Sequence, residues 1–169
     1  MTNVQIRLEQ PGDEVAVRDT NEQAFATLTE AALVDRLRDS PDSISLVATI
    51  GEHVVGHILF TPISIEPAPR VRVAGLAPMA VRPENQRSGI GSQLVRAGLH
   101  HCRQRGYAAV VVVGHPAFYP RFGFVPASSK ALTCEFPVPD EVFMAVELTA
   151  GALANVRGLV RYRPEFSEG

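Results

Sequence analysis

The segment over residues 81–92, V-R-P-E-N-Q-R-S-G-I-G-S, places strong limits on what this chain can fold into. An apolar strand ends near Val81, Pro83 stops it, and glycines at positions 89 and 91 open an apolar-periodic helix. Glycine lets the backbone approach a ligand closely, and the first N–H groups of a helix have no partner within it. The helix dipole also favours an anion there. The segment therefore predicts a phosphate-binding loop between a strand and a helix.

Two common phosphate loops do not fit this spacing. A Walker loop requires Lys directly after its last glycine, but Ser92 follows Gly91, and Lys130 is the only lysine of the chain. A dinucleotide fingerprint requires a third Gly or Ala at position 94, where the chain has Leu94. The first pattern is excluded and the second is disfavoured.

A second motif follows the next strand. Residues 108–113 form a continuous run of Ala and Val, which is typical of a strand buried on both faces. The sequence G-H-P-A-F-Y-P-R-F-G-F comes directly after it, at residues 114–124. The first segment resembles the acetyl-CoA signature of the GNAT superfamily of N-acetyltransferases, Gln/Arg-x-x-Gly-x-Gly/Ala, and the second resembles that superfamily's Tyr-x-x-Phe-Gly-Phe turn. The stretch L-A-P-M-A-V before the loop and the G-H-P after the buried strand are similar to the YhbS-like branch.

The resemblance implies an α/β fold of GNAT type. It has a mixed, mostly antiparallel sheet, helices on both faces, and a splayed parallel strand pair at the CoA cleft. It implies a single N-acetyltransferase domain over residues 1–169, with a core at about 4–148 and a C-terminal extension at about 149–169. Acetyl-CoA would bind as co-substrate, mainly to backbone groups. The positions expected to hold it are Met79, Ala80, Val81, Gln86, Arg87, Ser88, Gly89, Ile90, Gly91 and Ser92.

Tyr119 is the candidate general acid, because the resemblance places its hydroxyl near the CoA sulfur. A phenol is protonated at neutral pH, as the role requires. The alternative is that Tyr119 only packs between Phe118 and Phe122 and covers the CoA. A general base is harder to find, since residues 71–81 contain no acidic residue.

Glu22, on the predicted first helix, is one candidate base, and deprotonation through ordered water is another route. The alternative for Glu22 is a solvent-exposed helix residue. His57 is predicted to be a hydrogen-bonded core histidine, and His115 to shape the turn before Pro116. No metal site is expected, because His100, His101 and Cys102 are consecutive on a helix and their side chains diverge.

Composition limits the class of protein. The chain has 169 residues, of which 46% are hydrophobic and 20% charged, with a net charge of −2. This balance suits a globular domain and provides no basic surface for nucleic acid or for an anionic membrane. The N-terminus lacks the apolar core of a secretory signal, and no apolar run reaches membrane-spanning length. A cytoplasmic location is expected, with Cys102 and Cys134 as free thiols.

Local patterns predict the remaining elements. A strand is expected at residues 4–8, followed by a helix capped by Asp13 and by a second helix with a capping box at Thr27 and Glu30. A hairpin turns at residues 51–53, and Pro78 suggests a bulge or a local splay in the strand over residues 71–81. Residues 131–138 and 142–148 are predicted to form an antiparallel pair.

The resemblance implies transfer of an acetyl group from acetyl-CoA to a primary amine of a small molecule or peptide, by direct attack. No acyl-enzyme is expected, because neither cysteine has a recognisable Cys-His setting. The alternative is a catalytically idle acyl-CoA-binding module that acts as sensor or scaffold. No nucleic acid or membrane partner is expected, and the resemblance is compatible with a homodimer.

Overall fold

The computed structural model describes residues 3–167, which fold into two compact units. The first unit contains residues 3–60, 78–98 and 165–167, and the second contains residues 61–77 and 99–164. Strands β3 (His53–Pro62) and β5 (Arg72–Val81) and helix α3 (Ile90–Gln104) each run from one unit into the other. Within the described part of the chain, no helix is long and apolar enough to cross a membrane.

Three strands pair antiparallel side by side in the sheet of the first unit. Strand β1 (Val4–Leu8) pairs with β2 (Ile44–Ile50), and β2 pairs with β3 through the predicted hairpin. Gly51 has φ +60° in the turn, a conformation that glycine adopts without the cost that a Cβ would bring. The register of the β2–β3 pair shifts between Ala48 and Thr49, which marks a bulge.

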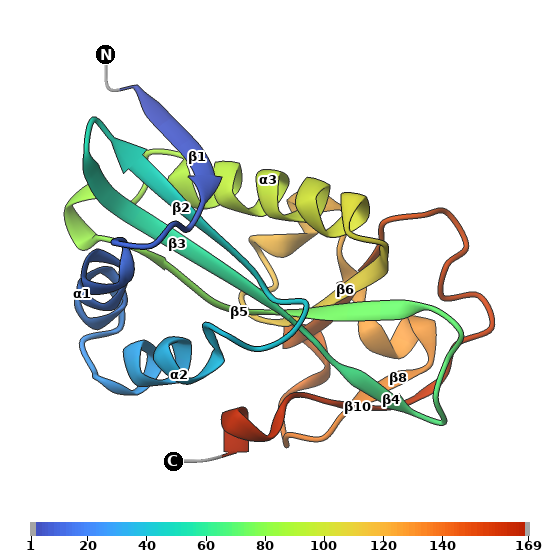
Figure 1. Cartoon of the computed structure of the whole chain (residues 1–169). Coiled ribbons are helices and arrows are strands. Elements are labelled where there is room, and N and C mark those ends of the chain that lie inside the picture. Colours follow the sequence, from blue (N-terminus) through green and yellow to red (C-terminus); the bar gives the residue numbers. More distant parts are fainter. Residues whose placement is uncertain (1–2, 168–169) are drawn as a thin grey trace. The chain divides into compact units, whose positions relative to one another are not determined.

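Helices cover both faces of this sheet (Figure 1). Helices α1 (Glu14–Phe25) and α2 (Thr29–Leu37) pack on one face. The buried cluster that joins them to the strands consists of Val17, Val34, Leu37, Val47, Val54 and Leu59. On the other face, a Cβ on Gly56 would lie 3.1 Å from Leu94 of α3, so this glycine allows close approach of helix and strand.

The second unit contains the parallel pair that was expected. Residues 72–76 of β5 run parallel to β6 (Tyr107–Val113), and the pairing extends from Arg72 and Tyr107 to Leu76 and Val112. Strand β9 (Phe143–Glu147) pairs antiparallel with β6, and β7 (Val125–Pro126) pairs antiparallel with β9. Because α3 connects two parallel strands, β5, α3 and β6 form a βαβ crossover.

A smaller sheet in the second unit corrects the predicted strand pairing. Strand β8 (Leu132–Cys134) does not pair with β9, but runs parallel to β10 (Gly158–Arg161). Strand β10 also pairs antiparallel with β4 (Ser64–Glu66). The predicted antiparallel pair is wrong because alternation along a segment indicates a strand and not its partner.

The structure adds detail to three further local predictions. The register of the β5–β6 pair shifts between Arg72 and Val73, and the pairing ends at Leu76, so the two strands separate just before Pro78. Asp13 occupies the N-cap position of α1, but its carboxylate accepts hydrogen bonds from Arg7 and from the backbone N–H of Gln10. Thr27 is not the N-cap of α2 but lies one residue before it. Its hydroxyl accepts a hydrogen bond from the N–H of Thr29 at 3.2 Å.

Short 3-10 helices also occur in the second half of the chain. They include η3 (Ala127–Lys130), η4 (Asp140–Val142) and η5 (Pro164–Ser167).

Candidate active site

The predicted phosphate-binding loop connects β5 to α3 in the first unit. After the 3-10 helix η1 (Pro83–Asn85), Arg87 has φ +62° and Gly89 has φ +86°. The carbonyl of Gly89 accepts the N–H of Gln93 at 3.1 Å, which is the first bond of the helical ladder. The N–H groups of residues 90–92 therefore come before the first helical hydrogen bond of α3 and lack partners within the helix. This geometry is that of a backbone anion site.

Internal hydrogen bonds hold the loop in this shape. The Ser88 hydroxyl donates to the carbonyl of Asn85 at 2.5 Å, and the Gln86 side-chain amide donates to the carbonyl of Val81 at 2.9 Å. A Cβ on Gly89 would meet no atom within 4 Å, so its positive φ, and not crowding, favours glycine there. The loop and the last residues of β5 thus bring all ten predicted acetyl-CoA positions together in one unit.

Arg82 anchors the start of the loop, a role that the sequence did not reveal. Its backbone N–H donates to Val55 at 2.9 Å, and its side-chain Nε donates to the carbonyl of Val54 at 2.8 Å. Its Nη1 lies 2.6 Å from Asp19 Oδ2 on α1, and this hydrogen bond lowers the pKa of Asp19. Arg82 therefore connects the loop to both β3 and α1. Nothing local in the sequence indicates these partners.

Two neighbouring hollows flank the loop on the side of the β2–β3 hairpin. The first has a volume of about 550 Å³ and the second about 580 Å³. Both are lined by Ile50, Glu84 and Asn85, and the second also reaches Ser88 and Ile90. Neither is lined by Gly89 or Gly91, but the second, through Ser88 and Ile90, adjoins the predicted anion site.

Tyr119 lies in the second unit, at the start of the 3-10 helix η2 (Tyr119–Phe122). Its ring contacts Phe118 and Phe124 edge to face, with centroids 5.0 Å and 5.5 Å away. A Cβ on Gly114 would lie 2.3 Å from Cε2 of Tyr119, so the ring requires glycine at the end of β6. The residue is 6% exposed, and burial raises the pKa of its phenol to about 12. Tyr119 is thus fully protonated at neutral pH.

His115 begins the turn that positions Tyr119. Its carbonyl accepts the N–H of Phe118 at 3.1 Å and that of Tyr119 at 3.4 Å, while its side chain is exposed. This agrees with the predicted structural role of His115. The turn closes at Gly123, which has φ +95° and donates its N–H to the carbonyl of Pro120.

Glu22, the candidate base, lies on α1 in the first unit and is half-buried. Within residues 3–167 its carboxylate forms no hydrogen bond or ion pair. The carboxylate is therefore available to a ligand, but no contact of the protein directs it to a reacting atom.

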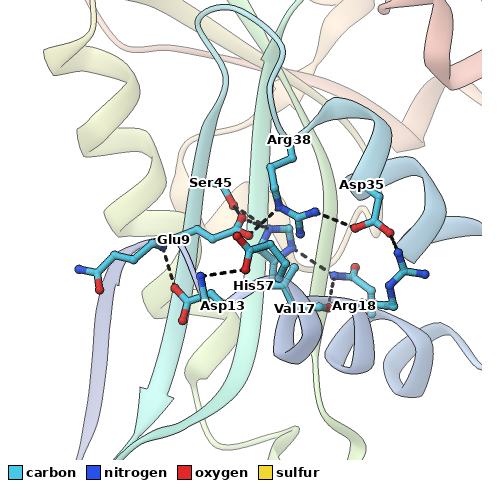
Figure 2. Close-up of polar contacts among 12 residues, drawn as sticks. Glu9, Asp13, Val17, Arg18, Asp35, Arg38, Ser45 and His57 are labelled. Atoms are coloured by element: carbon cyan, nitrogen blue, oxygen red, sulfur yellow. Dashed lines mark hydrogen bonds and ion pairs between the residues drawn. The ribbon is translucent and has the colours of Figure 1, made fainter.

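His57 lies at the centre of a buried polar network, as predicted for a core histidine (Figure 2). Its Nε2 lies 2.9 Å from the hydroxyl of Ser45 on β2, and its Nδ1 lies 3.3 Å from the amide nitrogen of Asn21 on α1. Ser45 in turn donates to Glu9 Oε1 at 2.5 Å. Since an amide NH₂ can only donate, Nδ1 accepts, and the ring carries its proton on Nε2.

Charged side chains continue this network toward α2. Glu9 Oε2 accepts a hydrogen bond from Arg38 Nε at 2.9 Å, and Arg38 Nη1 donates to Asp35 at 2.7 Å. Arg18 of α1 also pairs with Asp35 (Figure 2). The ring of His57 is fully buried, and desolvation, followed by the positive charge of Arg38, lowers its pKa to about 3. The network therefore joins β1, β2, β3, α1 and α2 around a neutral imidazole.

Neither cysteine is an activated nucleophile. Cys102 and Cys134 are free thiols, as expected. Burial raises the pKa of Cys102 to about 12 and also raises the pKa of Cys134. Since the thiolate is the nucleophilic form, these thiols are poor candidates for an acyl-enzyme. Among the described residues, no group of three His, Cys, Asp or Glu side chains is arranged to hold a metal ion.

Comparison with known proteins identifies the family. Residues 14–124 match the model of the Acetyltransferase (GNAT) family. The chain is 36% identical to the uncharacterized N-acetyltransferase YhbS of Escherichia coli K12, over 99% of this chain and 98% of that protein. It is 37% identical to the uncharacterized N-acetyltransferase YjhQ of the same organism, over 82% and 81% of the two chains.

Solved structures agree with the sequence comparison. The crystal structure of E. coli YhbS in complex with CoA superposes with a TM-score of 0.93 and covers 99% of this chain and 93% of that one. A GNAT family acetyltransferase from Brucella melitensis in complex with acetyl-CoA is 31% identical, with a TM-score of 0.80 and coverage of 98% and 99%. With the loop that opens α3 and the parallel pair β5–β6, these matches show that the chain belongs to the GNAT family of acetyltransferases.

Proposed function

We propose that this acetyltransferase moves the acetyl group of acetyl-CoA to a primary amine of a small molecule or peptide by direct attack. The observation that carries the proposal is the loop at residues 86–92, which ends in the N–H groups of residues 90–92 that have no partner within α3. The CoA and acetyl-CoA complexes of two relatives support the choice of donor. The cytoplasmic location, the single domain and the homodimer stay predictions.

Each chemical requirement of the reaction is assigned to a residue. The N–H groups of residues 87–92 bind the pyrophosphate, and the backbone of Met79 to Val81 aligns the pantetheine arm. The amine nitrogen forms a bond to the thioester carbon, the C–S bond breaks, and the Tyr119 proton passes to the sulfur. Glu22, through ordered water, takes the proton that the amine loses. The raised pKa of the Tyr119 phenol supports its role, since it keeps the proton until a thiolate appears.

Thiol release tests this function. Free CoA is followed from acetyl-CoA in the presence of polyamines, aminoglycosides, amino acids and peptides with free N-termini, with a sample without amine as control. The proposal predicts release that depends on the amine and a matching acetylated product. Thermal stabilisation by acetyl-CoA without release on any amine would favour the idle acyl-CoA-binding module. The absence of any stabilisation would overturn the donor itself.

Replacing Gly89 with Ala is expected to weaken acetyl-CoA binding about tenfold, because a side chain at φ +86° costs about 1 kcal/mol and displaces the loop N–H groups. Isothermal titration with acetyl-CoA measures the effect. Gly12→Ala is the matched control: Gly12 has φ +102°, and a Cβ there also meets no atom within 4 Å. The Gly12→Ala variant should lose a similar amount of folding stability, and its affinity for acetyl-CoA should be unchanged. Equal affinities for both variants would contradict the role of the loop.

A further inference from the structure

A continuous path of hydrogen bonds runs from helix α1 to the phosphate-binding loop. It begins at Asp19 on α1, whose Oδ2 accepts a hydrogen bond from Arg82 Nη1 at 2.6 Å. The carbonyl of Arg82 accepts the N–H of Asn85 at 2.8 Å, and the carbonyl of Asn85 accepts the Ser88 hydroxyl at 2.5 Å. Ser88 directly precedes Gly89, where the backbone turns into α3. The path therefore links the position of α1 to the shape of the loop.

Both partners of the bond between α1 and the loop are held from their own side. The Nε of Arg82 donates to the carbonyl of Val54 on β3 at 2.8 Å, and the Arg82 side chain is only 15% exposed. A guanidinium is planar and directs its N–H groups at fixed angles, so the contact with β3 also sets the direction of Nη1. On α1, the side-chain amide of Gln23 donates to both carboxylate oxygens of Asp19, at 3.1 and 3.3 Å. The ion pair is thus oriented before any ligand binds.

The bond also spans a place where packing is incomplete. The hollow of about 550 Å³ beside the loop is lined by residues of three elements, which include Ala16 of α1, Val54 and Val55 of β3, and Arg82 and Asn85. Because side chains surround this space without filling it, dispersion contacts hold these elements together less firmly there than in a packed core. The charge-assisted bond between Arg82 and α1 connects two of them beside the open space.

We propose that Arg82 is a positioning residue for acetyl-CoA binding, which through Asp19 couples the position of α1 to the shape of the loop. This inference rests on the proposed binding of acetyl-CoA by the loop N–H groups. Arg82 acts through the backbone at Asn85 and makes no contact of its own with the co-substrate. Because coupling between two sites is reciprocal, acetyl-CoA on the loop should also stabilise α1, the helix that carries Glu22.

The first test needs no ligand and compares backbone hydrogen exchange in the parent protein, Asp19→Asn and Asp35→Asn. Asp35→Asn is the matched control, because it removes the same charge and breaks the ion pair of α1 with α2 through Arg18. Asp19→Asn should speed exchange in the loop at residues 86–93 at least about threefold, whereas Asp35→Asn should speed exchange in α1 and α2 alone. Unchanged loop exchange in Asp19→Asn would overturn the proposal.

The second test uses the sign of the change in acetyl-CoA affinity, measured by isothermal titration. Acetyl-CoA is an anion, so loss of the Asp19 charge should tighten binding if that charge acts only at a distance. The proposal predicts the opposite: Asp19→Asn should weaken binding about three- to tenfold, and Asp35→Asn should change it less than about twofold. Unchanged or tighter binding by Asp19→Asn would overturn the proposal. An equal loss in Asp35→Asn would do the same, because affinity would then follow general stability.

A double-mutant cycle shows whether Asp19 acts through Arg82. Arg82→Gln should weaken acetyl-CoA binding at least about tenfold, and Asp19→Asn added to it should weaken binding less than about twofold further. Equal effects of Asp19→Asn in both backgrounds would show that it acts independently of Arg82 and would refute the coupling.

The two measurements also separate this inference from the proposed function. Faster loop exchange in Asp19→Asn, in a parent protein that binds no acetyl-CoA, would refute the donor and with it the role of Arg82 in binding. Binding by the parent without the exchange effect would leave the donor in place and refute the coupling alone. Both effects together are the expected result, with slower exchange of α1 in the acetyl-CoA complex of the parent and not in that of Arg82→Gln.

Discussion

Tyr119→Phe is expected to lower kcat for acetyl transfer at least about 100-fold, with less than about a threefold change in KM for acetyl-CoA. The substitution removes only the hydroxyl. The ring contacts with Phe118 and Phe124 and the close approach to Gly114 are kept, so the fold of the turn should not change. Without the phenol, CoA leaves as an unprotonated thiolate. Steady-state thiol release and thermal shift with acetyl-CoA measure turnover and binding separately.

The same pair of measurements distinguishes catalysis from packing. If Tyr119 only covers the cofactor, its phenylalanine variant should keep turnover, since Phe preserves the ring. Equal loss of kcat and of acetyl-CoA affinity would show that the hydroxyl serves binding, and the general-acid role would be abandoned. Tyr107→Phe is the matched control, because Tyr107 is also buried and lies on β6 in the same unit. It should change neither quantity by more than about twofold.

The second large effect is a loss of stability in acid that originates at His57. Its pKa is about 3 in the folded chain, against about 6.5 for an unperturbed histidine. Between these values the unfolded chain binds a proton that the folded chain does not, so stability is complete above about pH 6.5 and falls as the pH decreases. We expect the free energy of unfolding to fall by about 1.4 kcal/mol per pH unit between about pH 6 and about pH 4.

The buried network explains why folded His57 resists protonation. A second ring proton would have to sit on Nδ1, facing the amide NH₂ of Asn21 at 3.3 Å. Asn21 itself is anchored through a hydrogen bond to the carbonyl of Val17 at 3.0 Å, so turning its amide would break that contact. Protonation would therefore disturb the attachment of α1 to β3. The positive charge of Arg38 opposes it further.

Denaturant unfolding of the parent protein and of His57→Gln, at several pH values, measures this contribution. The variant should be less stable at pH 8 by about 1 to 3 kcal/mol, because Ser45 and Asn21 lose a partner, and its stability should depend less on pH. The comparison is needed because His101 also has a lowered pKa and adds slope of the same sign. Asp13 and Asp19 have lowered pKa values as well, and their contributions are lost at more acidic pH. Equal slopes for the two proteins would disprove the role of His57.

Short-range patterns predicted much of this protein from its sequence. The loop before α3 and the turn around Tyr119 were found because glycine and proline restrict the backbone within a few residues. The helices and most strands followed from apolar periodicity for the same reason. A buried run of Ala and Val also predicted the parallel strand β6, because such a strand has no polar face. The family was visible in two motifs that are both local.

Only the tertiary structure decided which distant segments meet. Strand β8 pairs with β10 and not with β9, Arg82 reaches Asp19, and His57 is enclosed by Ser45, Asn21 and Glu9. Tyr162 lies against Gly75, far back in the chain. Alternation and spacing specify what an element is, but a partner is selected by how whole faces pack and which polar groups are satisfied together. That selection is made by the packed core, and no single segment of sequence contains it.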